Sequence, residues 1–412
     1  MEKAITIGLQ TSKDIQDSMD ELARLVEAAG ATVIESVIQK RDKTEARTLF
    51  GPGKVLEIQA LVEELEADLV VVNHELSGSQ LRNLEEIIEC KIIDRTNLIL
   101  DIFASRATSK EGQLQVKLAQ LQYRLPRIIG FSDYLSRTGG GIGTRGPGEQ
   151  KLETDRRHVE REIHAIKKQL KTVEKQRETK RKRRTESQVP IVSFVGYTNA
   201  GKSTLMNQLM VSEEEVFVKD MLFATLDTSL RKAELPQGEI VLLADTVGFV
   251  SELPTALIEA FKSTLEEIKA SDIIVHVLDA SHDDVELQMS TTNKILDDLE
   301  IKDKKILTVF NKMDQVISPE VFVDETGQNN KLYISALSKK DIKSVLNKIE
   351  SMLHEQYVTA TLFIPFEDYS YYNMIASKHI ITDEKHNDSG TIIEVKLDEL
   401  ALKPFERFKM TK

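Results

Sequence analysis

The stretch Gly196-Tyr197-Thr198-Asn199-Ala200-Gly201-Lys202-Ser203 decides the fold of this 412-residue chain. It has the form of a P-loop, in which glycines let backbone N–H groups turn inward around phosphates. An apolar run at 191–195 precedes it and a helical pattern follows it, as the motif requires. The alternative, a glycine-rich turn beside a lysine, leaves that context unexplained. We therefore predict an open α/β sheet that binds a nucleoside triphosphate. The expected phosphate-side residues are Gly196, Asn199, Ala200, Gly201, Lys202, Ser203 and Thr204.

Catalytic and magnesium-binding groups are expected near this loop. Lys202 reaches the outer two phosphates, and the Ser203 hydroxyl can hold Mg²⁺. A buried-strand pattern at 239–244 ends in Asp245-Thr246-Val247-Gly248, where Asp245 can hold Mg²⁺ through water and the Gly248 N–H can meet the γ-phosphate.

The loop Phe223-Ala224-Thr225-Leu226-Asp227-Thr228-Ser229 is where such an enzyme keeps the threonine that closes over the metal. We assign this role to Thr225, with Phe223 beside the nucleotide. Thr228 remains an alternative, as does a plain β-prone loop. The predicted catalytic set is therefore Lys202, Thr225, Asp245 and Gly248, and the predicted Mg²⁺ set is Ser203, Thr225 and Asp245.

Two further strand ends predict the base. Asn311-Lys312-Met313-Asp314 follows the apolar run at 306–310, and Ser335-Ala336-Leu337 follows a run at 331–334. Asp314 can accept hydrogen bonds from guanine N1–H and the exocyclic amine, an edge that adenine lacks. Each motif alone has an ordinary alternative, a helix-cap turn or an N-cap. Together and in this order they predict GTP rather than ATP as the substrate.

Phe249 follows Gly248, where Ras-like enzymes have a glutamine that orients the attacking water. A phenylalanine cannot orient water, so we expect slow hydrolysis by the chain alone. The missing stabilisation, worth roughly three to five orders of magnitude where an arginine finger supplies it, must come from a partner or a cation. Asn199 matches the asparagine with which potassium-activated GTPases hold K⁺. A role for Asn199 in stabilising the turn is the alternative.

Composition predicts a multidomain chain with a local excess of positive charge. The net charge is −12, yet residues 151–184 hold 14 Lys or Arg and 6 Asp or Glu, a local +8 that leaves −20 elsewhere. No apolar run reaches the roughly 20 residues that a membrane span needs. Met1-Glu2-Lys3 leads directly into a strand pattern. We therefore expect a cytoplasmic monomer, loosely associated with membranes or ribosomes at most. The single cysteine, Cys90, is assigned packing rather than chemistry.

Periodicity divides the chain into four predicted domains. Residues 1–105 alternate strand and helix, which predicts a small parallel α/β domain, with Gly51-Pro52-Gly53-Lys54 as a turn before a helix. Residues 106–188 contain two leucine-rich stripes that predict an antiparallel helical hairpin; two separately packed helices are the alternative. Residues 189–357 are the P-loop GTPase domain with a Ras-like fold, and residues 358–412 form a small α+β appendage.

The connector of the hairpin is rich in glycine and contains arginine. Ser136 to Glu149 holds six glycines and two arginines, and we place a flexible tip at about 130–148. A basic glycine-rich tip can grip RNA phosphates without reading sequence, whereas a disordered linker is the plainer alternative. Five consecutive basic residues, 180–184, end the second arm, and Thr185 to Gln188 is expected to be a linker. The predicted RNA contacts are Arg137, Gly140, Gly141, Arg145, Lys182 and Arg183.

Several of these segments together resemble the HflX family. They are Ala107-Thr108-Ser109-Lys110-Glu111-Gly112 with the tract to Leu121, Gly139 to Gln150 with Glu153-Thr154-Asp155-Arg156-Arg157, Leu222 to Asp227, and Asp245 to Phe249. The likeness covers nearly the whole chain except the carboxyl-terminal appendage. It implies a GTPase, stimulated by the ribosome, that binds the large ribosomal subunit and rRNA and splits stalled or idle ribosomes, with the hairpin tip directed to the peptidyl-transferase region. ATP use by the amino-terminal domain is also implied, although no P-loop is found there.

Two other functions fit parts of the sequence. An ATP-dependent, helicase-like RNA remodelling enzyme would use the same basic arm, but the Asn311–Asp314 motif opposes it. A GTP-switched protein-interaction module would use the hairpin to bind a coiled-coil partner instead of RNA.

Overall fold

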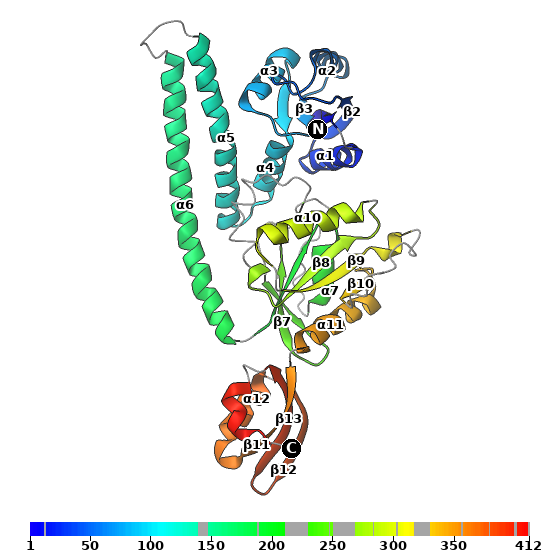
Figure 1. Ribbon diagram of the computed structural model, residues 1–412, viewed down its shortest axis with the longest axis vertical. Coiled ribbons are helices and arrows are strands. Elements are labelled where there is room, and N and C mark those ends of the chain that lie inside the picture. The colour runs from blue at the N-terminus through cyan, green and yellow to red at the C-terminus, as the bar shows by residue number, and fades with distance from the viewer. Residues whose placement is uncertain are drawn as a thin grey trace. The chain divides into compact units, whose positions relative to one another are not determined.

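The computed structural model describes residues 1–11, 14–138, 147–187, 189–210, 230–246, 248–249, 268–282, 284–301, 304–316, 330–355, 357–378, 380–398 and 402–410. The chain divides into two compact units (Figure 1). The first contains Met1–Glu186 together with Gly248 and Phe249, and the second contains the described residues of 187–246 and of 268–410. Each unit is described by itself. Among the described residues, no helix combines the length and the apolar character that crossing a membrane requires.

The first unit begins with a four-stranded parallel sheet of order β2-β1-β3-β4. One face packs against α2 and α3 through a core that includes Ile5, Ile7, Val70 and Val72. On the other face α1 lies close to β1. A Cβ added at Gly8 of β1 would be only 2.5 Å from Met19 Sδ of α1. The elements are β1 (Lys3–Gln10), α1 (Gln16–Ala28), β2 (Thr32–Lys40), α2 (Pro52–Leu65), β3 (Leu69–Val72), α3 (Gly78–Ile88), β4 (Lys91–Asp94) and α4 (Arg95–Arg106). The predicted parallel α/β fold is confirmed.

Turn and cap residues explain where these helices start. Gly51 is the N-cap of α2 and Pro52 occupies its first turn, which confirms the predicted turn at Gly51–Lys54. Ser77 caps α3 with a reciprocal capping box to Gln80. Helix α4 was not predicted. It starts at Arg95, directly after β4, so no loop composition marks its beginning.

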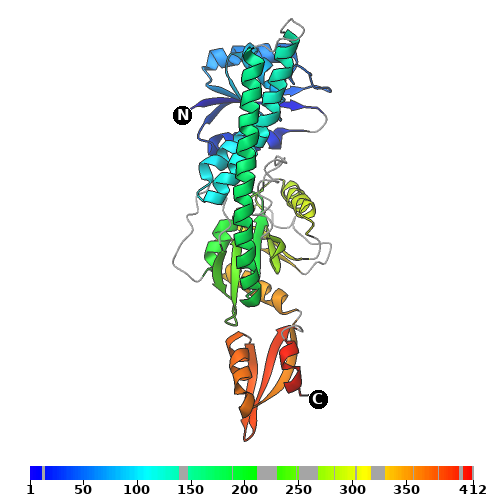
Figure 2. The same ribbon diagram turned by 90° about the vertical axis from the view of Figure 1, so that its left-hand side faces the viewer.

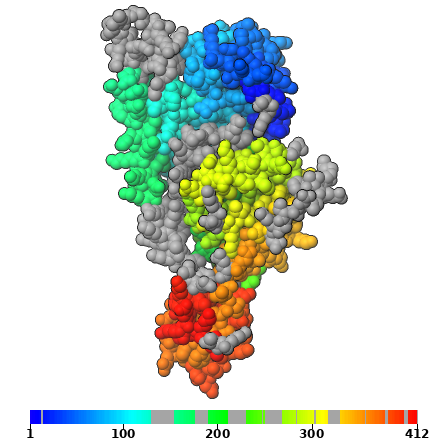
Figure 3. Space-filling view, viewed as in Figure 1, coloured from blue at the N-terminus to red at the C-terminus, as the bar shows by residue number. Residues whose placement is uncertain are grey.

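Two long helices follow, α5 (Lys110–Thr138) and α6 (Pro147–Ser187), and they lie side by side in both views (Figure 1 and Figure 2). The predicted leucine stripes meet between them, with Leu118 and Leu121 of α5 against Val159 and Ile166 of α6. In the space-filling view the coloured parts of α5 and α6 lie next to each other (Figure 3). The helical hairpin is therefore confirmed as a packed pair.

The boundaries of the hairpin differ from the prediction. The tip was expected at about 130–148, but α5 continues to Thr138 and α6 already starts at Pro147, so only 139–146 lie outside the described residues. A proline at the first helical position has its φ preset for a helix, which explains the early start. The linker expected at Thr185–Gln188 is helical as far as Ser187.

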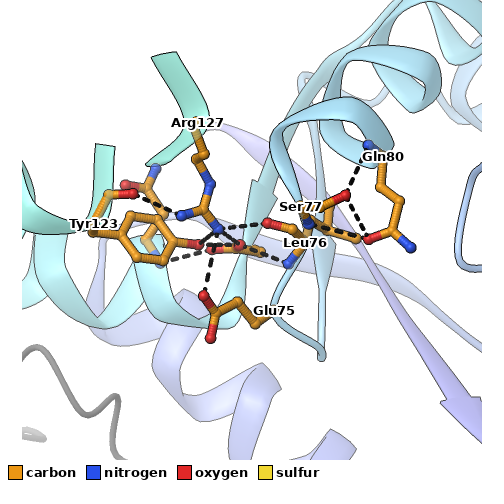
Figure 4. A network of polar contacts seen from close by, with 8 residues as sticks. Glu75, Leu76, Ser77, Gln80, Tyr123 and Arg127 are labelled. Carbon is orange, nitrogen blue, oxygen red and sulfur yellow. Dashed lines mark hydrogen bonds and ion pairs between the residues drawn. The ribbon is translucent and has the colours of Figure 1, made fainter. Parts of the chain in front are cut away.

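A buried polar network fixes α5 to the sheet domain (Figure 4). The Asp94 carboxylate, at the end of β4, accepts hydrogen bonds from the Tyr123 hydroxyl, from Arg127 Nη2 at 3.0 Å and from the Leu76 N–H at 3.0 Å. Arg127 also donates to the Leu76 carbonyl oxygen at 2.6 Å, and its guanidinium lies 3.4 Å from the centre of the Tyr123 ring. Burial and the neighbouring Asp94 charge raise the pKa of Tyr123. Helix α5 is thus joined to both β4 and the start of α3.

The second unit contains a six-stranded sheet of order β10-β9-β8-β5-β7-β6, in which only the β6–β7 pair is antiparallel. Helices α7 and α11 share one face of the sheet, and α10 covers the other. The elements are β5 (Ile191–Gly196), α7 (Lys202–Leu209), β6 (Leu230–Glu234), β7 (Ile240–Asp245), β8 (Ile273–Asp279), α10 (Val285–Asp298), β9 (Lys305–Asn311), η1 (Met313–Gln315), β10 (Lys331–Tyr333) and α11 (Lys339–His354).

The carboxyl-terminal part is an antiparallel sheet of order β11-β13-β12 with its own apolar core. Leu362, Ile393 and Val395 form its centre together with Phe405. A tight turn at Asn387–Gly390 joins β12 to β13. The elements are β11 (Tyr357–Pro365), η3 (Phe366–Asp368), α12 (Tyr369–Lys378), β12 (Ile380–Asn387), β13 (Gly390–Asp398) and η4 (Lys403–Phe408).

Candidate functional site

The P-loop lies between β5 and α7, and its glycines have positions that no other residue can fill. Gly196 has φ +146, and an added Cβ would lie 2.1 Å from the Val277 carbonyl oxygen. Gly201, the N-cap of α7, has φ +89, and its Cβ would meet Asn311 Nδ2 at 2.2 Å. Asn199 is exposed and left-handed, with φ 61. Glycine is therefore needed for both the backbone angles and the close approach of neighbouring strands.

Lys202 is the first residue of α7, and the loop wraps around its side chain. Its Nζ donates to the carbonyl oxygens of Gly196 at 3.0 Å and Tyr197 at 2.7 Å, and the residue is 6% exposed. Burial lowers the pKa of Lys202 to about 8, and the nearby Asp245 charge opposes that shift. Among the described residues this buried cation bonds to carbonyl oxygens and has the Asp245 carboxylate nearby, so it gains from an added anion, which is what a phosphate group supplies.

Ser203 and Asp245 lie together, as a shared metal site requires. Ser203 Oγ donates to Asp245 Oδ2 at 2.9 Å, although the two residues are on α7 and β7. Thr246 next to it donates to the Phe194 carbonyl oxygen at 2.6 Å, which fixes the end of β7 against β5. A hydroxyl and a carboxylate oxygen are the ligand types that Mg²⁺ prefers, so the donor set fits this ion. The described residues contain no cluster of three or more His, Cys, Asp or Glu that would form a separate metal centre.

Asn311 joins the two loops that are predicted to read the base to the P-loop. Its Nδ2 donates to the Ala200 carbonyl oxygen at 2.9 Å, and its Oδ1 accepts from the Ala336 N–H at 2.9 Å. The side chain is 2% exposed. Ser335 precedes this contact, and its N–H donates to Asp341 of α11 at 3.0 Å. The structure thus brings three predicted segments to one place.

The remaining base-side residues lie at the surface beside Asn311. Lys312, the N-cap of η1, has a left-handed backbone with φ 63, and Asp314 within η1 is exposed. Leu337 is 75% exposed and its N–H donates to Ser335 Oγ at 3.4 Å. An exposed Asp314 carboxylate has room to meet a base edge.

Several predicted residues lie where the structure gives less detail. Phe223 and Thr225 lie outside the described residues, as do Gly140, Gly141 and Arg145. Arg137 is in α5, and Lys182 and Arg183 are in α6, but their side chains are outside the described part. Gly248 is described and buried, and Phe249 after it is 2% exposed.

Two residues near the site were missed from the sequence. His276 on β8 is 2% exposed, and its Nε2 has no hydrogen-bond partner among the described residues. Burial, and secondarily the Lys202 charge, lower the pKa of His276 to about 4. Asp279 at the end of β8 pairs with Lys312. The signal that identified Asp245, a carboxylate ending an apolar run, is also present at Asp279.

Comparisons with known proteins agree with this geometry. Three family models match in succession: "GTP-binding GTPase N-terminal" at 16–104, "GTP-binding GTPase Middle Region" at 106–184, and "50S ribosome-binding GTPase" at 191–312. A protein named GTPase HflX from Caldanaerobacter subterraneus subsp. tengcongensis is 45% identical over 397 residues, 96% of this chain and 91% of that protein. GTPase HflX of Escherichia coli K12 is 38% identical over 363 residues, 88% of this chain and 84% of that protein.

A solved structure shares the fold over most of the chain. It is described as "crystal structure of SsGBP and GDP complex", and its TM-score is 0.50 at 23% sequence identity. The match covers 85% of this chain and 98% of the chain in that structure. At this identity the likeness concerns the fold alone.

Proposed function

The chain belongs to the HflX family of GTPases and is a GTP hydrolase with a 50S ribosome-binding GTPase domain, and on that premise we propose that it uses GTP to dissociate stalled or idle ribosomes. The observation that supports this most is the continuity of α6. This 41-residue helix includes the basic run 180–184, and only residues 188–190 separate it from β5, the strand that leads into the P-loop. A basic arm followed directly by a nucleotide site suits a GTPase that acts on RNA.

The nucleotide site of this proposal uses the residues predicted to bind the phosphates, the metal and the base. Lys202 and the N–H groups of Gly196 to Thr204 bind the phosphates, and Gly248 binds the γ-phosphate. Asn311, Lys312, Asp314, Ser335, Ala336 and Leu337 surround the guanine. When Mg²⁺ is bound, it neutralises charge on the β- and γ-phosphates; Ser203, Asp245 and Thr225 are the residues that would hold it.

The switch follows from differential binding. GTP and Mg²⁺ order the Thr225 loop and the loop that begins at Asp245, and this form binds the large subunit more tightly than the GDP form does. A ligand shifts an equilibrium only by its affinity difference between the two states, so hydrolysis releases the chain by removing that difference. The hairpin tip, with Arg137, Gly140, Gly141 and Arg145, and the basic run with Lys182 and Arg183 contact rRNA.

The chemical step needs help from outside the described site, because Phe249 cannot orient water. The ribosome supplies part of this help, and K⁺ held by the exposed Asn199 amide supplies another part. We expect faster GTP hydrolysis in potassium than in sodium buffer for the wild type, and equal rates for Asn199→Ala. Equal wild-type rates in the two salts would contradict a potassium role.

Sedimentation of 70S ribosomes tests the proposal directly. With the chain and GTP, or a non-hydrolysable analogue, the 70S peak is expected to convert to subunits, whereas GDP leaves it unchanged. Lys202→Ala is the control, since it removes the phosphate-binding cation and should abolish splitting with every nucleotide. Unchanged 70S profiles under all three nucleotides would refute ribosome splitting.

A second experiment separates the tip from the nucleotide site. Replacing residues 139–146 by a short linker keeps Pro147 at the start of α6. We expect this variant to bind GTP with unchanged affinity but to leave 70S ribosomes intact. Loss of GTP affinity would show instead that the tip belongs to the nucleotide site.

A further inference from the structure

Asp279 ends β8 directly beside Asn311 of β9, its register partner in the parallel pair. The residue is 8% exposed. Its two carboxylate oxygens have different partners: Oδ1 accepts from the Ser281 N–H at 3.0 Å and from Ser281 Oγ at 2.6 Å, and Oδ2 accepts from Lys312 Nζ at 2.6 Å. Oδ1 therefore bonds within the turn that follows β8, and Oδ2 bonds to a lysine 33 residues further along the chain.

The backbone around Asp279 is held from two sides. The Asp279 N–H donates to Gln288 Oε1 at 3.1 Å, and Gln288 is a 3% exposed residue of α10. The next residue, Ala280, donates its N–H to the Asn311 carbonyl oxygen at 2.9 Å. These contacts hold the Asp279 backbone in place, so its carboxylate is already positioned before a ligand binds.

Lys312, by contrast, needs an anchor. Its backbone is in the left-handed region at φ 63, which costs a non-glycine residue free energy and persists only where surrounding contacts hold it. Its side chain has a flexible stem of four carbons and would sample many rotamers if it had no partner to hold it. The Lys312 and Asp279 side chains are 23% and 12% exposed, so water screens this pair less than a surface ion pair.

We propose that Asp279 is a positioning residue of the guanine site, which acts by holding Lys312. This inference rests on the proposed assignment of Asn311, Lys312 and Asp314 to the base. The ion pair keeps the Lys312 side chain and its left-handed backbone in one arrangement, and so presets the segment from Asn311 to Asp314 before the nucleotide binds. Preorganisation of this kind lowers the cost of binding. A purely local role for Asp279 would account for the Ser281 contacts but not for Oδ2.

The test is a double-mutant cycle on nucleotide affinity in the full chain. The Kd values of GDP and GTP with Mg²⁺ are measured for the wild type, Asp279→Asn, Lys312→Met and the double variant. Loss of a charge-assisted hydrogen bond to a partly exposed lysine predicts a roughly tenfold weaker Kd for Asp279→Asn. In the Lys312→Met background the same change should alter Kd by less than about twofold, because its partner is gone.

Asp272→Asn is the matched control. Asp272 precedes the amino end of β8 and accepts from the Ile191 N–H at 2.8 Å, so it tests loss of a carboxylate at the far end of the same strand. Its Kd values should equal those of the wild type. If Asp279→Asn is not recovered folded, Asp279→Glu replaces it; this variant keeps the charge and is expected to bind within about threefold of the wild type.

The outcomes separate the inference from the proposed function. Additive effects of Asp279→Asn and Lys312→Met, or an Asp279→Asn variant that binds like the wild type, would overturn the positioning role while guanine binding stands. An Asp279→Glu variant that folds but binds at least tenfold more weakly would also overturn it. A wild type that binds ATP as tightly as GTP would instead remove the assigned guanine site itself.

Discussion

The side chain of Asn311 bonds to Ala200 of the P-loop, with Nδ2 2.9 Å from the Ala200 carbonyl oxygen. Its Oδ1 accepts from the Ala336 N–H, also at 2.9 Å. A buried amide that uses both of its ends fixes the distance between the P-loop and the two loops that are predicted to read the base. The phosphate and base ends of the site are therefore built as one unit, and a change at this joint should affect both.

Gly201→Ala tests this joint. The added Cβ would lie 2.2 Å from Asn311 Nδ2, and the φ of +89 is unfavourable for alanine. We expect the affinity for GTP and GDP to fall by roughly a hundredfold or more, since strain of about 1–3 kcal/mol adds to the steric conflict. Gly238→Ala, also at positive φ (+88) but with open space around it, is the control and should keep nucleotide affinity. Wild-type affinity in Gly201→Ala would show that the joint adapts freely.

Asp314→Asn tests the base assignment. The amide presents N–H donors where the carboxylate presented only acceptors, so it suits xanthine, which has a carbonyl in place of the exocyclic amine of guanine. We expect GTP hydrolysis to weaken by roughly a hundredfold or more in kcat/KM and xanthosine triphosphate to become the better substrate. A variant that still prefers GTP would contradict the role of Asp314.

Tyr123→Phe tests the network that fixes α5 to the sheet domain. Removing the hydroxyl leaves the buried Asp94 carboxylate one hydrogen bond short, at a cost of about 1.5–3 kcal/mol. Hydrogen exchange of amides in α4 and α5 should quicken accordingly in the full chain. Tyr372→Phe removes a hydroxyl that bonds Glu384 at 3.0 Å on the surface and should change exchange little. Equal effects of the two variants would refute a special role for Asp94.

His276 should make the second unit sensitive to acid. Burial lowers its pKa to about 4 in the folded state, below the ordinary value of 6.5, so the unfolded chain binds a proton that the folded chain does not. The folding stability linked to the uncharged His276 is fully present above about pH 6.5 and is lost as the pH falls toward 4. Between pH 7 and pH 5 the expected loss from this group is about 2 kcal/mol. Urea unfolding of His276→Asn should show a smaller loss over this range than the wild type, and an equal loss would contradict the assignment.

The phosphate and base motifs were predictable because each is a short pattern at the end of an apolar strand. Lys202 bonds to the Tyr197 carbonyl oxygen within the P-loop, and Asn311 lies against Ala200 and Gly201 of the same loop. Asp279 carries the same strand-end signal but belongs to no widely shared motif, and only the fold shows that it faces Lys312. His276 could not be predicted as buried, because a histidine within an apolar strand gives no sign of which face it occupies.

The limits of the elements were less predictable than their existence. Strand β6 is the antiparallel edge of the sheet and reads Leu-Arg-Lys-Ala-Glu, so its charge hides its strand character. Helix α6 runs through the five basic residues that were expected to end the arm and continues to Ser187, within the stretch that was expected to be a linker. The roles of Phe223, Thr225 and the tip residues stay predictions.

Affinity of the chain for isolated large ribosomal subunits, measured with a non-hydrolysable GTP analogue and with GDP, tests the central claim most directly. The account predicts at least roughly tenfold tighter binding with the analogue, because only a difference between the two states can drive a switch. Equal affinities in the two nucleotide states would contradict it.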